Sequence, residues 1–119
     1  MIRKAVIVSI AGPYLTKIEI DILKKEKPWG IILFRRNILS ENQLTNLTKK
    51  IKRIMKDKKF PILIDEEGGR VSRLSNFIDN SIYDQKYFGD LYKTNNLLGI
   101  HLYKTYINEL SKILIKNGI

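Results

Sequence analysis

Three consecutive carboxylates at positions 65 to 67 have the clearest chemical potential in this sequence. Asp65, Glu66 and Glu67 follow an apolar run and open the stretch Asp-Glu-Glu-Gly-Gly-Arg-Val-Ser-Arg. Because successive extended residues point to opposite sides of the backbone, Asp65 and Glu67 can face one way while Glu66 faces the other. The stretch therefore predicts a loop that divides its acids between two sides.

Two glycines and two arginines complete this acidic loop, which spans residues 65–73. Gly68 and Gly69 permit a turn through backbone conformations that are closed to other residues, which leaves room for a ligand or another loop. Arg70 and Arg73 can then fold back and compensate carboxylates that would otherwise repel one another, and they are expected to offset the charges of Glu66 and Glu67. The predicted result is a compact turn with acids and guanidinium groups close together.

Four kinds of site are compatible with the acidic loop. A divalent metal site needs several oxygens on one point, which adjacent residues rarely achieve, and the paired carboxylates of a glycosidase usually come from different strands. A salt-bridged turn with a structural role is the third interpretation. The fourth is a substrate-binding loop whose carboxylate and guanidinium groups hydrogen-bond a polyol such as a sugar. The residues favour the fourth and leave the others open.

The segments around the acidic loop alternate between strands and helices. Short apolar runs bounded by turn residues predict strands over residues 4–10, 29–34 and 60–64. Amphipathic periodicity predicts helices between Thr16 and Pro28, with a Thr16–Glu19 capping box, from Ser40 to about Lys58, and from about Leu97 to Lys116. Residues 75–96 are expected to form a polar, tyrosine-containing segment.

The connections between these elements are short, and the strands are hydrophobic without interruption, as is typical of parallel sheets. The second strand is expected to be buried on both faces. Parallel sheets present the C-terminal ends of their strands to ligands, and Asp65 follows the third strand at that end. The predicted fold class is therefore α/β with right-handed crossovers.

Length and composition limit the class of protein. A chain of 119 residues with 44% hydrophobic and 29% charged residues fits one globular domain. The absence of cysteine favours a reducing compartment, and we expect a cytoplasmic protein. The N-terminal apolar run is better interpreted as a strand than as a signal peptide, and no run is long enough to span a membrane.

The net charge of +10 raises an alternative function, a small basic α/β binding module for nucleic acid or an acidic partner. The densest basic stretch is Lys49–Lys59. Its apolar members continue a helical stripe made by Leu44, Leu47, Ile51, Ile54 and Met55. The lysines then occupy the opposite, solvated face, so nucleic-acid binding is not favoured.

Two motifs resemble glycoside hydrolase family three. Ile-Asp-Glu-Glu-Gly-Gly-Arg-Val-Ser-Arg-Leu resembles the Asp-Gln-Glu-Gly-Gly-Arg-Val-x-Arg signature of its bacterial β-N-acetylhexosaminidases, with Glu66 where the family usually has Gln. Pro-Trp-Gly-Ile-Ile-Leu-Phe-Arg-Arg-Asn, residues 28–37, resembles the family's Gly-x-Ile-Leu-Phe-x-Arg-Asn second strand, in the right order and at the right distance. The closing Lys-Asn-Gly-Ile also resembles the family, so the resemblance spans nearly the whole chain.

The resemblance implies a fold and an activity. The fold is the N-terminal portion of a TIM-type (β/α) barrel with about three βα units and parallel strands. Since a complete barrel takes about 250 residues, residues 1–119 are expected to be an incomplete N-terminal barrel domain. The implied enzyme is a glycoside hydrolase that removes terminal N-acetylglucosamine from peptidoglycan fragments during cell-wall recycling, and no cofactor is expected.

The resemblance also assigns residues. Asp65 and Arg73 match family positions that bind the sugar substrate. Support of the loop is expected of the other matched positions, which are Glu67, Gly68, Gly69, Arg70, Arg36 and Asn37.

The family's catalytic groups are not expected in this chain. The family nucleophile is an Asp late in the sequence, and a His on a mobile loop with a Lys-His-Phe-Pro-Gly-His type motif supplies the acid/base. The sole histidine, His101, falls in the last predicted helix without such surroundings. We therefore assign no catalytic residue and expect the isolated chain to be inactive. The expected partners are an N-acetylglucosamine-containing sugar and either the remainder of the barrel or a second copy.

Overall fold

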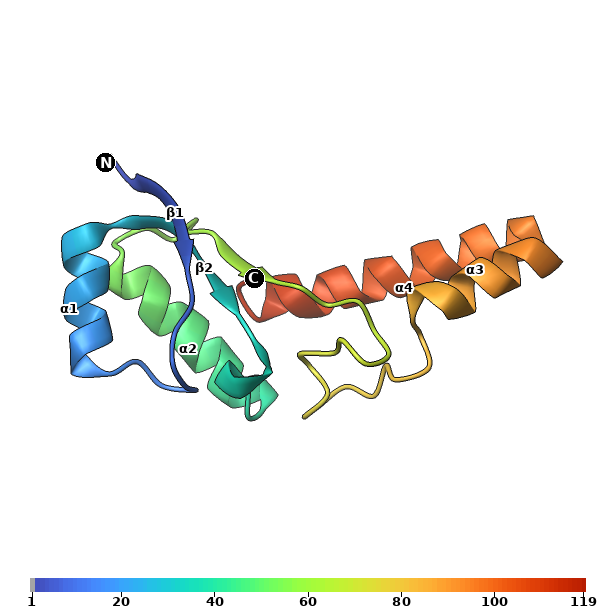
Figure 1. The fold of residues 1–119 in the computed structure, drawn as a ribbon, viewed down its shortest axis with the longest axis horizontal. Helices are drawn as coiled ribbons and strands as arrows, with labels where there is room; N and C mark the ends of the chain where they lie inside the picture. Colours follow the sequence, from blue (N-terminus) through green and yellow to red (C-terminus); the bar gives the residue numbers. More distant parts are fainter. Residues whose placement is uncertain (1) are drawn as a thin grey trace.

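The computed structural model describes residues 2–119 and contains three strands, four α-helices and one 3-10 turn (Figure 1). The elements in chain order are β1 (Lys4–Val8), α1 (Lys17–Glu26), β2 (Pro28–Leu33), η1 (Arg35–Asn37), α2 (Glu41–Ile54), β3 (Ile62–Ile64), α3 (Gln85–Thr94) and α4 (Asn96–Lys116).

The three strands form one parallel sheet in the order β1-β2-β3. Pro28 at the start of β2 is level with Lys4 of β1, and Leu33 at its end is level with Ile64 of β3. The predicted α/β class with parallel strands is confirmed, and the arrangement is that of part of a (β/α) barrel. Two of the strands are shorter than expected: β1 ends at Val8 and β3 begins at Ile62. β2 has the expected length and begins one residue earlier, at Pro28.

The hydrophobic core lies between β2 and α2. The predicted helical stripe is confirmed, since Leu44, Leu47, Ile51 and Met55 are all buried and Ile54 packs against them. The lysines of the same helix point away from the core, which is the usual arrangement for an amphipathic surface helix.

The burial expected for the apolar strands is only partly correct. In β2, Ile31 and Leu33 are buried, but the side chain of Trp29 remains 47% exposed. In β1, which is an outer strand of the sheet, Val6 and Ile7 are also about half exposed. An outer strand has a neighbour on one side alone, and so the hydrophobicity of its residues does not ensure their burial.

The ends of the first two helices follow local capping signals. Thr16 and Glu19 form the predicted capping box, and the backbone N–H of Glu19 donates to the Thr16 hydroxyl at 3.2 Å. The helix α1 ends at Glu26, and the following Lys27, just before Pro28, adopts a left-handed backbone conformation. The prediction that α2 reaches Lys58 is wrong, because Lys56 also turns left-handed and the helix stops at Ile54.

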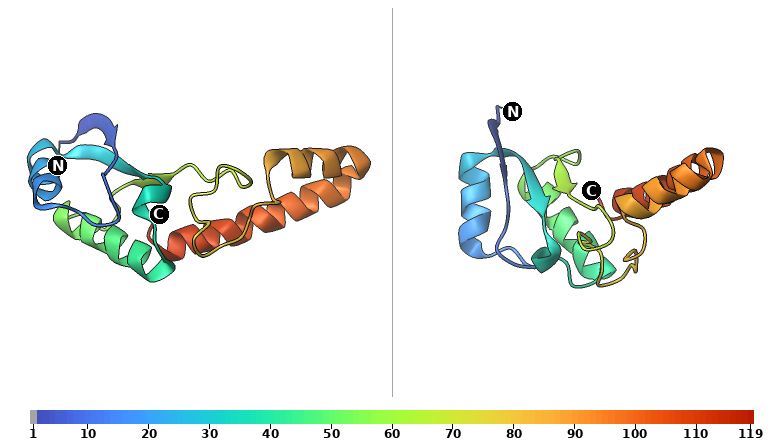
Figure 2. Two further views of the ribbon diagram at one scale, coloured as in Figure 1. Left: turned by 60° about the horizontal axis from the view of Figure 1, so that its bottom comes forward. Right: turned by 45° about the vertical axis from the view of Figure 1, so that its right-hand side comes forward.

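The last two helices form a hairpin that projects from the sheet and makes the molecule elongated, 53 × 28 × 20 Å (Figures 1 and 2). The helix α3 lies within residues 75–96, where no helix was predicted. Asp84 caps this helix by accepting a hydrogen bond from the Tyr87 N–H at 2.7 Å. Phe88 then packs on Tyr103 and Tyr106 of α4, with ring centres 5.0 and 5.3 Å away. Tertiary aromatic packing thus stabilises a short helix of weak intrinsic propensity.

The C-terminal end of α4 returns to α2. Asn117 is buried and accepts a hydrogen bond from the Thr45 hydroxyl at 2.6 Å, while its carbonyl accepts one from Thr48 at 2.7 Å. Gly118 has a φ of 81°, which confirms the predicted left-handed helix stop at Asn-Gly. None of the helices within residues 2–119 has the length and hydropathy that a membrane span requires.

Candidate functional site

Three loops meet at one end of the sheet, each following a strand. They are the segment after β1 around Ile10, the η1 turn after β2, and the acidic loop after β3. Because the strands are parallel, their C-terminal ends share one edge, which is where α/β proteins bind their ligands. The contacts between these loops define the candidate site.

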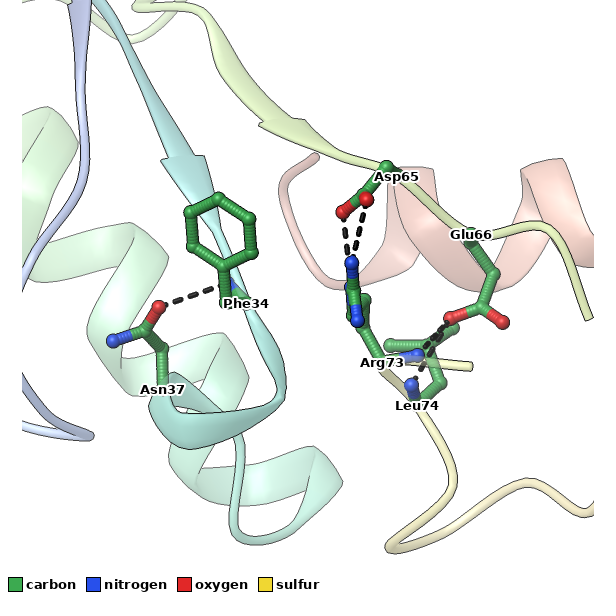
Figure 3. Close-up of polar contacts among 6 residues, drawn as sticks. All are labelled: Phe34, Asn37, Asp65, Glu66, Arg73 and Leu74. Carbon is green, nitrogen blue, oxygen red and sulfur yellow. Dashed lines mark hydrogen bonds and ion pairs between the residues drawn. The ribbon is translucent and has the colours of Figure 1, made fainter. Parts of the chain in front are cut away.

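Asp65 and Arg73 form a two-bonded ion pair inside the acidic loop (Figure 3). The Arg73 Nε donates to Asp65 Oδ1 at 2.9 Å, and its Nη2 donates to Oδ2 at 2.6 Å. The guanidinium hydrogen bonds lower the pKa of Asp65, and the carboxylate in turn raises the pKa of Arg73. The side chains are 41% and 23% exposed, so solvent and solutes reach the pair.

Glu66 binds the backbone at the end of the acidic loop, around Arg73 and Leu74. Its Oε2 accepts hydrogen bonds from the N–H groups of Arg73 at 2.7 Å and Leu74 at 3.0 Å (Figure 3). Its Oε1 accepts from the Asn80 side-chain amide at 2.9 Å. That amide also contacts the Tyr106 hydroxyl of α4 at 3.2 Å. Glu66 therefore connects the acidic loop to the helical hairpin.

The charges of the acidic loop pair differently from the prediction. Arg70 and Arg73 were expected to offset Glu66 and Glu67, whereas Arg73 pairs with Asp65 and backbone amides satisfy Glu66. Arg70 is exposed and forms no ion pair with another of residues 2–119. The side chain of Glu67 is exposed as well, and this residue contributes through its N–H, which donates to the Val71 carbonyl at 3.0 Å.

The two glycines adopt the conformations that the sequence predicts. Gly68 and Gly69 have φ values of 78° and 59°, in the left-handed region. A side chain at Gly68 would collide with the carbonyl oxygen of Tyr83, and one at Gly69 would come within 2.8 Å of the Asp84 Cβ. The glycines thus allow the segment before α3 to pack directly on the loop.

Asn37 joins the loops after the first two strands. It is fully buried, its Oδ1 accepts from the Phe34 N–H at 2.8 Å, and its amide donates to the carbonyls of Ile10 at 3.0 Å and Gly12 at 2.9 Å. Arg36 donates from Nε to the same Ile10 carbonyl at 3.2 Å. Arg36 and Asn37, which both match family positions, therefore bind the backbone of the loop that follows β1.

The ring of Phe34 lies close to guanidinium groups from two loops. The guanidinium carbon of Arg36 is 4.7 Å from its centre, and that of Arg73 is 5.6 Å away. At these distances the cation–π attraction of the ring helps to orient the planar guanidinium groups. Phe34, Glu66 and Asn80 were not among the predicted site residues. The sequence signals for them were the three consecutive acids, which include Glu66, and the apolar end of the second strand, which includes Phe34; nothing in the sequence pointed to Asn80.

The other two chemistries considered for the loop find no support in these contacts. Asp65 and Glu66 bind different partners, and within residues 2–119 no three His, Asp or Glu side chains are arranged to hold a metal ion. His101 is exposed on α4.

Comparison with known proteins identifies relatives for this arrangement. No protein-family model matches the chain. A β-hexosaminidase from Bordetella pertussis is 35% identical over 99 residues, which is 82% of this chain and 27% of that protein. NagZ from Neisseria gonorrhoeae, solved in complex with N-trifluoroacetyl-D-glucosamine, superposes with a TM-score of 0.55 and 42% identity over 64% of this chain and 22% of NagZ.

A β-N-acetylglucosaminidase of glycoside hydrolase family 3 from Paenibacillus also superposes, with a TM-score of 0.53, 29% identity and 59% of this chain covered, against 14% of that enzyme. This chain is similar to part of the enzymes of glycoside hydrolase family 3. It spans between 19% and 27% of the length of curated family relatives such as those from Haemophilus ducreyi and Bordetella pertussis. This similarity does not favour the alternative of a small nucleic-acid-binding module.

Proposed function

We propose that this chain supplies part of the sugar-binding subsite of a β-N-acetylhexosaminidase. The observation that carries the proposal is the solvent-accessible Asp65–Arg73 pair at the C-terminal edge of a parallel sheet. A carboxylate and a guanidinium held side by side offer acceptors and donors to neighbouring sugar hydroxyls. The N-trifluoroacetyl-glucosamine complex of the related NagZ supports an N-acetylglucosamine-type ligand.

The proposed roles follow from the contacts of each side chain. Each oxygen of Asp65 uses one acceptor position for Arg73 and keeps another for a sugar O–H. Because the pKa of Asp65 is lowered, the group remains an anionic acceptor at neutral pH. Arg73 keeps further N–H donors for the sugar. Arg36, Asn37, Gly68, Gly69 and the N–H of Glu67 support the loops, and the contacts above add Glu66 to this group. Arg70, which was expected to support the loop, makes no side-chain contact within residues 2–119 that assigns it this role.

The reaction itself requires groups from outside this chain. We propose that residues 1–119 are one portion of a barrel domain, and that the nucleophile and the acid/base belong to other parts of the enzyme. The substrate class is peptidoglycan fragments with terminal N-acetylglucosamine, in a cytoplasmic recycling role. Either the remaining barrel strands or a second copy of the chain would cover the outer strands β1 and β3, which are free to pair.

The test is a titration of the chain with N-acetylglucosamine, followed by backbone NMR. We expect shifts at residues of the acidic loop, and we expect Asp65→Asn to weaken binding about tenfold or more, as for a lost hydrogen bond to a charged group. Asp79→Asn, an exposed acid that bonds Ser81 instead, is the matched control and should leave the affinity unchanged. Shifts confined to other regions, or equal affinities for the two variants, would refute the role of Asp65.

A second measurement addresses activity. The chain should not hydrolyse a chromogenic N-acetylglucosaminide, since it holds none of the proposed catalytic groups. Turnover that disappears in Asp65→Ala would show that this chain is catalytic on its own and would overturn the division of roles.

A further inference from the structure

A pocket lies at the opposite end of the sheet from the acidic loop. In βαβ units the helices run back against the strands, so the C-terminal ends of α1 and α2 come together near the start of β2 (Figure 1). Between these ends is a pocket of about 410 Å³. It is lined by Leu23, Lys24, Lys27, Ile54, Met55 and Lys56.

The floor of this pocket is apolar and its rim is cationic. Leu23 and Met55 belong to the hydrophobic core, yet each presents an edge to the pocket, and Ile54 is half-buried beside them. The three lysines are exposed, and none of them takes part in an ion pair within residues 2–119.

No acid lines the pocket, and the acids nearest to its lysines in the sequence are already paired. Glu26, next to Lys27, binds Lys4, and Asp57, next to Lys56, binds Arg3. The positive charge at the rim is therefore not neutralised from within the protein, and it is complementary to an anion.

Two of the rim lysines occupy unusual backbone positions. Lys27 and Lys56 have φ values of 47° and 51°, and they are the two non-glycine residues of the described chain with a positive φ. Helices that end in a left-handed residue usually place glycine there, because a Cβ is unfavourable in this conformation. Both helices here carry a lysine instead, and both lysines line the same pocket.

The helix dipoles do not explain this placement. Cations are favourable near a helix C-terminus, but Lys24 and Lys25 in the last turn of α1, and Lys52 and Arg53 in that of α2, already provide them. A glycine at the left-handed position would remove the backbone cost and leave those cations in place. Retained strain that converges on one pocket is typical of a functional site.

We propose that this pocket binds a small amphipathic anion, with its apolar part on Leu23, Ile54 and Met55 and its carboxylate or phosphate group among the lysines. The volume is within the range of small-molecule sites, about 300–1,000 Å³. The proposal does not depend on the sugar site, which lies at the other end of the strands.

The probe for this site is 1-naphthyl phosphate, titrated into the 119-residue chain and followed by NMR of side-chain methyl groups. We expect shifts at Leu23, Ile54 and Met55, and much weaker binding of the uncharged 1-naphthol. Shifts confined to the aromatic face of α3 and α4, or equal binding of the two compounds, would overturn the proposal.

Glycine variants of the two left-handed lysines distinguish an effect on ligand affinity from an effect on stability. Lys27→Gly and Lys56→Gly should each weaken binding of the phosphate by about threefold to fivefold, the value of one exposed charge contact. Neither should lower the urea midpoint, because glycine relieves the left-handed backbone. Lys50→Gln, which removes an exposed charge of α2 outside the pocket, is the matched control and should bind normally. An equal loss of affinity in this control would assign binding to a general polyanion surface and refute a defined site.

Discussion

Glu66 is the residue whose removal most directly tests how the acidic loop is held. Its carboxylate accepts hydrogen bonds from the N–H groups of Arg73 and Leu74 and from the amide of Asn80. In Glu66→Ala these donors lose their acceptor. The backbone of Arg73 is then no longer held in the position from which its side chain binds Asp65. We therefore expect Glu66→Ala to destabilise the loop strongly.

The magnitude follows from the number and burial of the lost contacts. The three hydrogen bonds are partly buried, and bonds of this kind to a charged acceptor contribute about 1–1.5 kcal/mol each after partial replacement by water. The expected loss is about 3–4 kcal/mol. In Glu66→Gln the amide oxygen still accepts the two backbone N–H groups. Its NH2 can donate to Asn80 Oδ1, a buried oxygen without a hydrogen-bond partner among the described residues, once that amide turns over. The expected cost is below about 1 kcal/mol.

The assay combines urea denaturation with hydrogen exchange at single amides. The amides of Arg73 and Leu74 should lose most of their protection in Glu66→Ala, and they should keep it in Glu66→Gln. Amides in α2, which Glu66 does not touch, provide the internal control. If the two variants exchange alike at Arg73 and Leu74, or if neither differs from the parent chain, Glu66 does not hold the loop and the reasoning is refuted.

Three further predictions concern the same edge of the sheet. Gly68→Ala should cost about 2–4 kcal/mol, from the left-handed φ and a collision with a neighbouring carbonyl, whereas Gly12→Ala, which has open space around it, should be nearly neutral in urea denaturation. Asn37→Ala should cost about 2–4 kcal/mol, because three backbone groups, one buried and two partly buried, each lose a hydrogen bond, and a loss under 1 kcal/mol would contradict its role as a link between loops. The pKa of Asp65 is lowered in the folded state, so its pairing with Arg73 stabilises the fold above about pH 4 and is lost as the pH falls through the folded pKa. Between pH 6 and pH 3 the urea midpoint should therefore fall less steeply with pH in Asp65→Asn than in the parent chain. Equal slopes in the two proteins would exclude a contribution of the Asp65–Arg73 pair to stability.

Much of the fold was predictable because its signals are local. The alternation of apolar runs and amphipathic segments predicted the three parallel strands and the two helices that cover them. Thr16 and Gly118 act through neighbouring residues at the ends of their helices, so their roles could be predicted from the sequence around them. The same holds for the left-handed turn at Gly68 and Gly69, which depends on backbone sterics alone.

The errors arose where a residue's environment depends on distant parts of the chain. The helix α3 was missed because its stability comes from the packing of Phe88 on Tyr103 and Tyr106 of another helix. Trp29 was expected to be buried, yet burial depends on which elements cover the strand, and its side chain stays half exposed.

The candidate site divides in the same way. The sequence by itself determined that acids, glycines and arginines would stand at the end of the third strand, because strand and turn signals act over a few residues. Only the tertiary structure decided that Arg73 binds Asp65, that backbone amides satisfy Glu66, and that Arg70 extends into solvent. The physical reason is that several pairings of neighbouring charges are compatible with the same order of residues. The path of the loop between β3 and α3 brings only one set of donors within hydrogen-bonding distance.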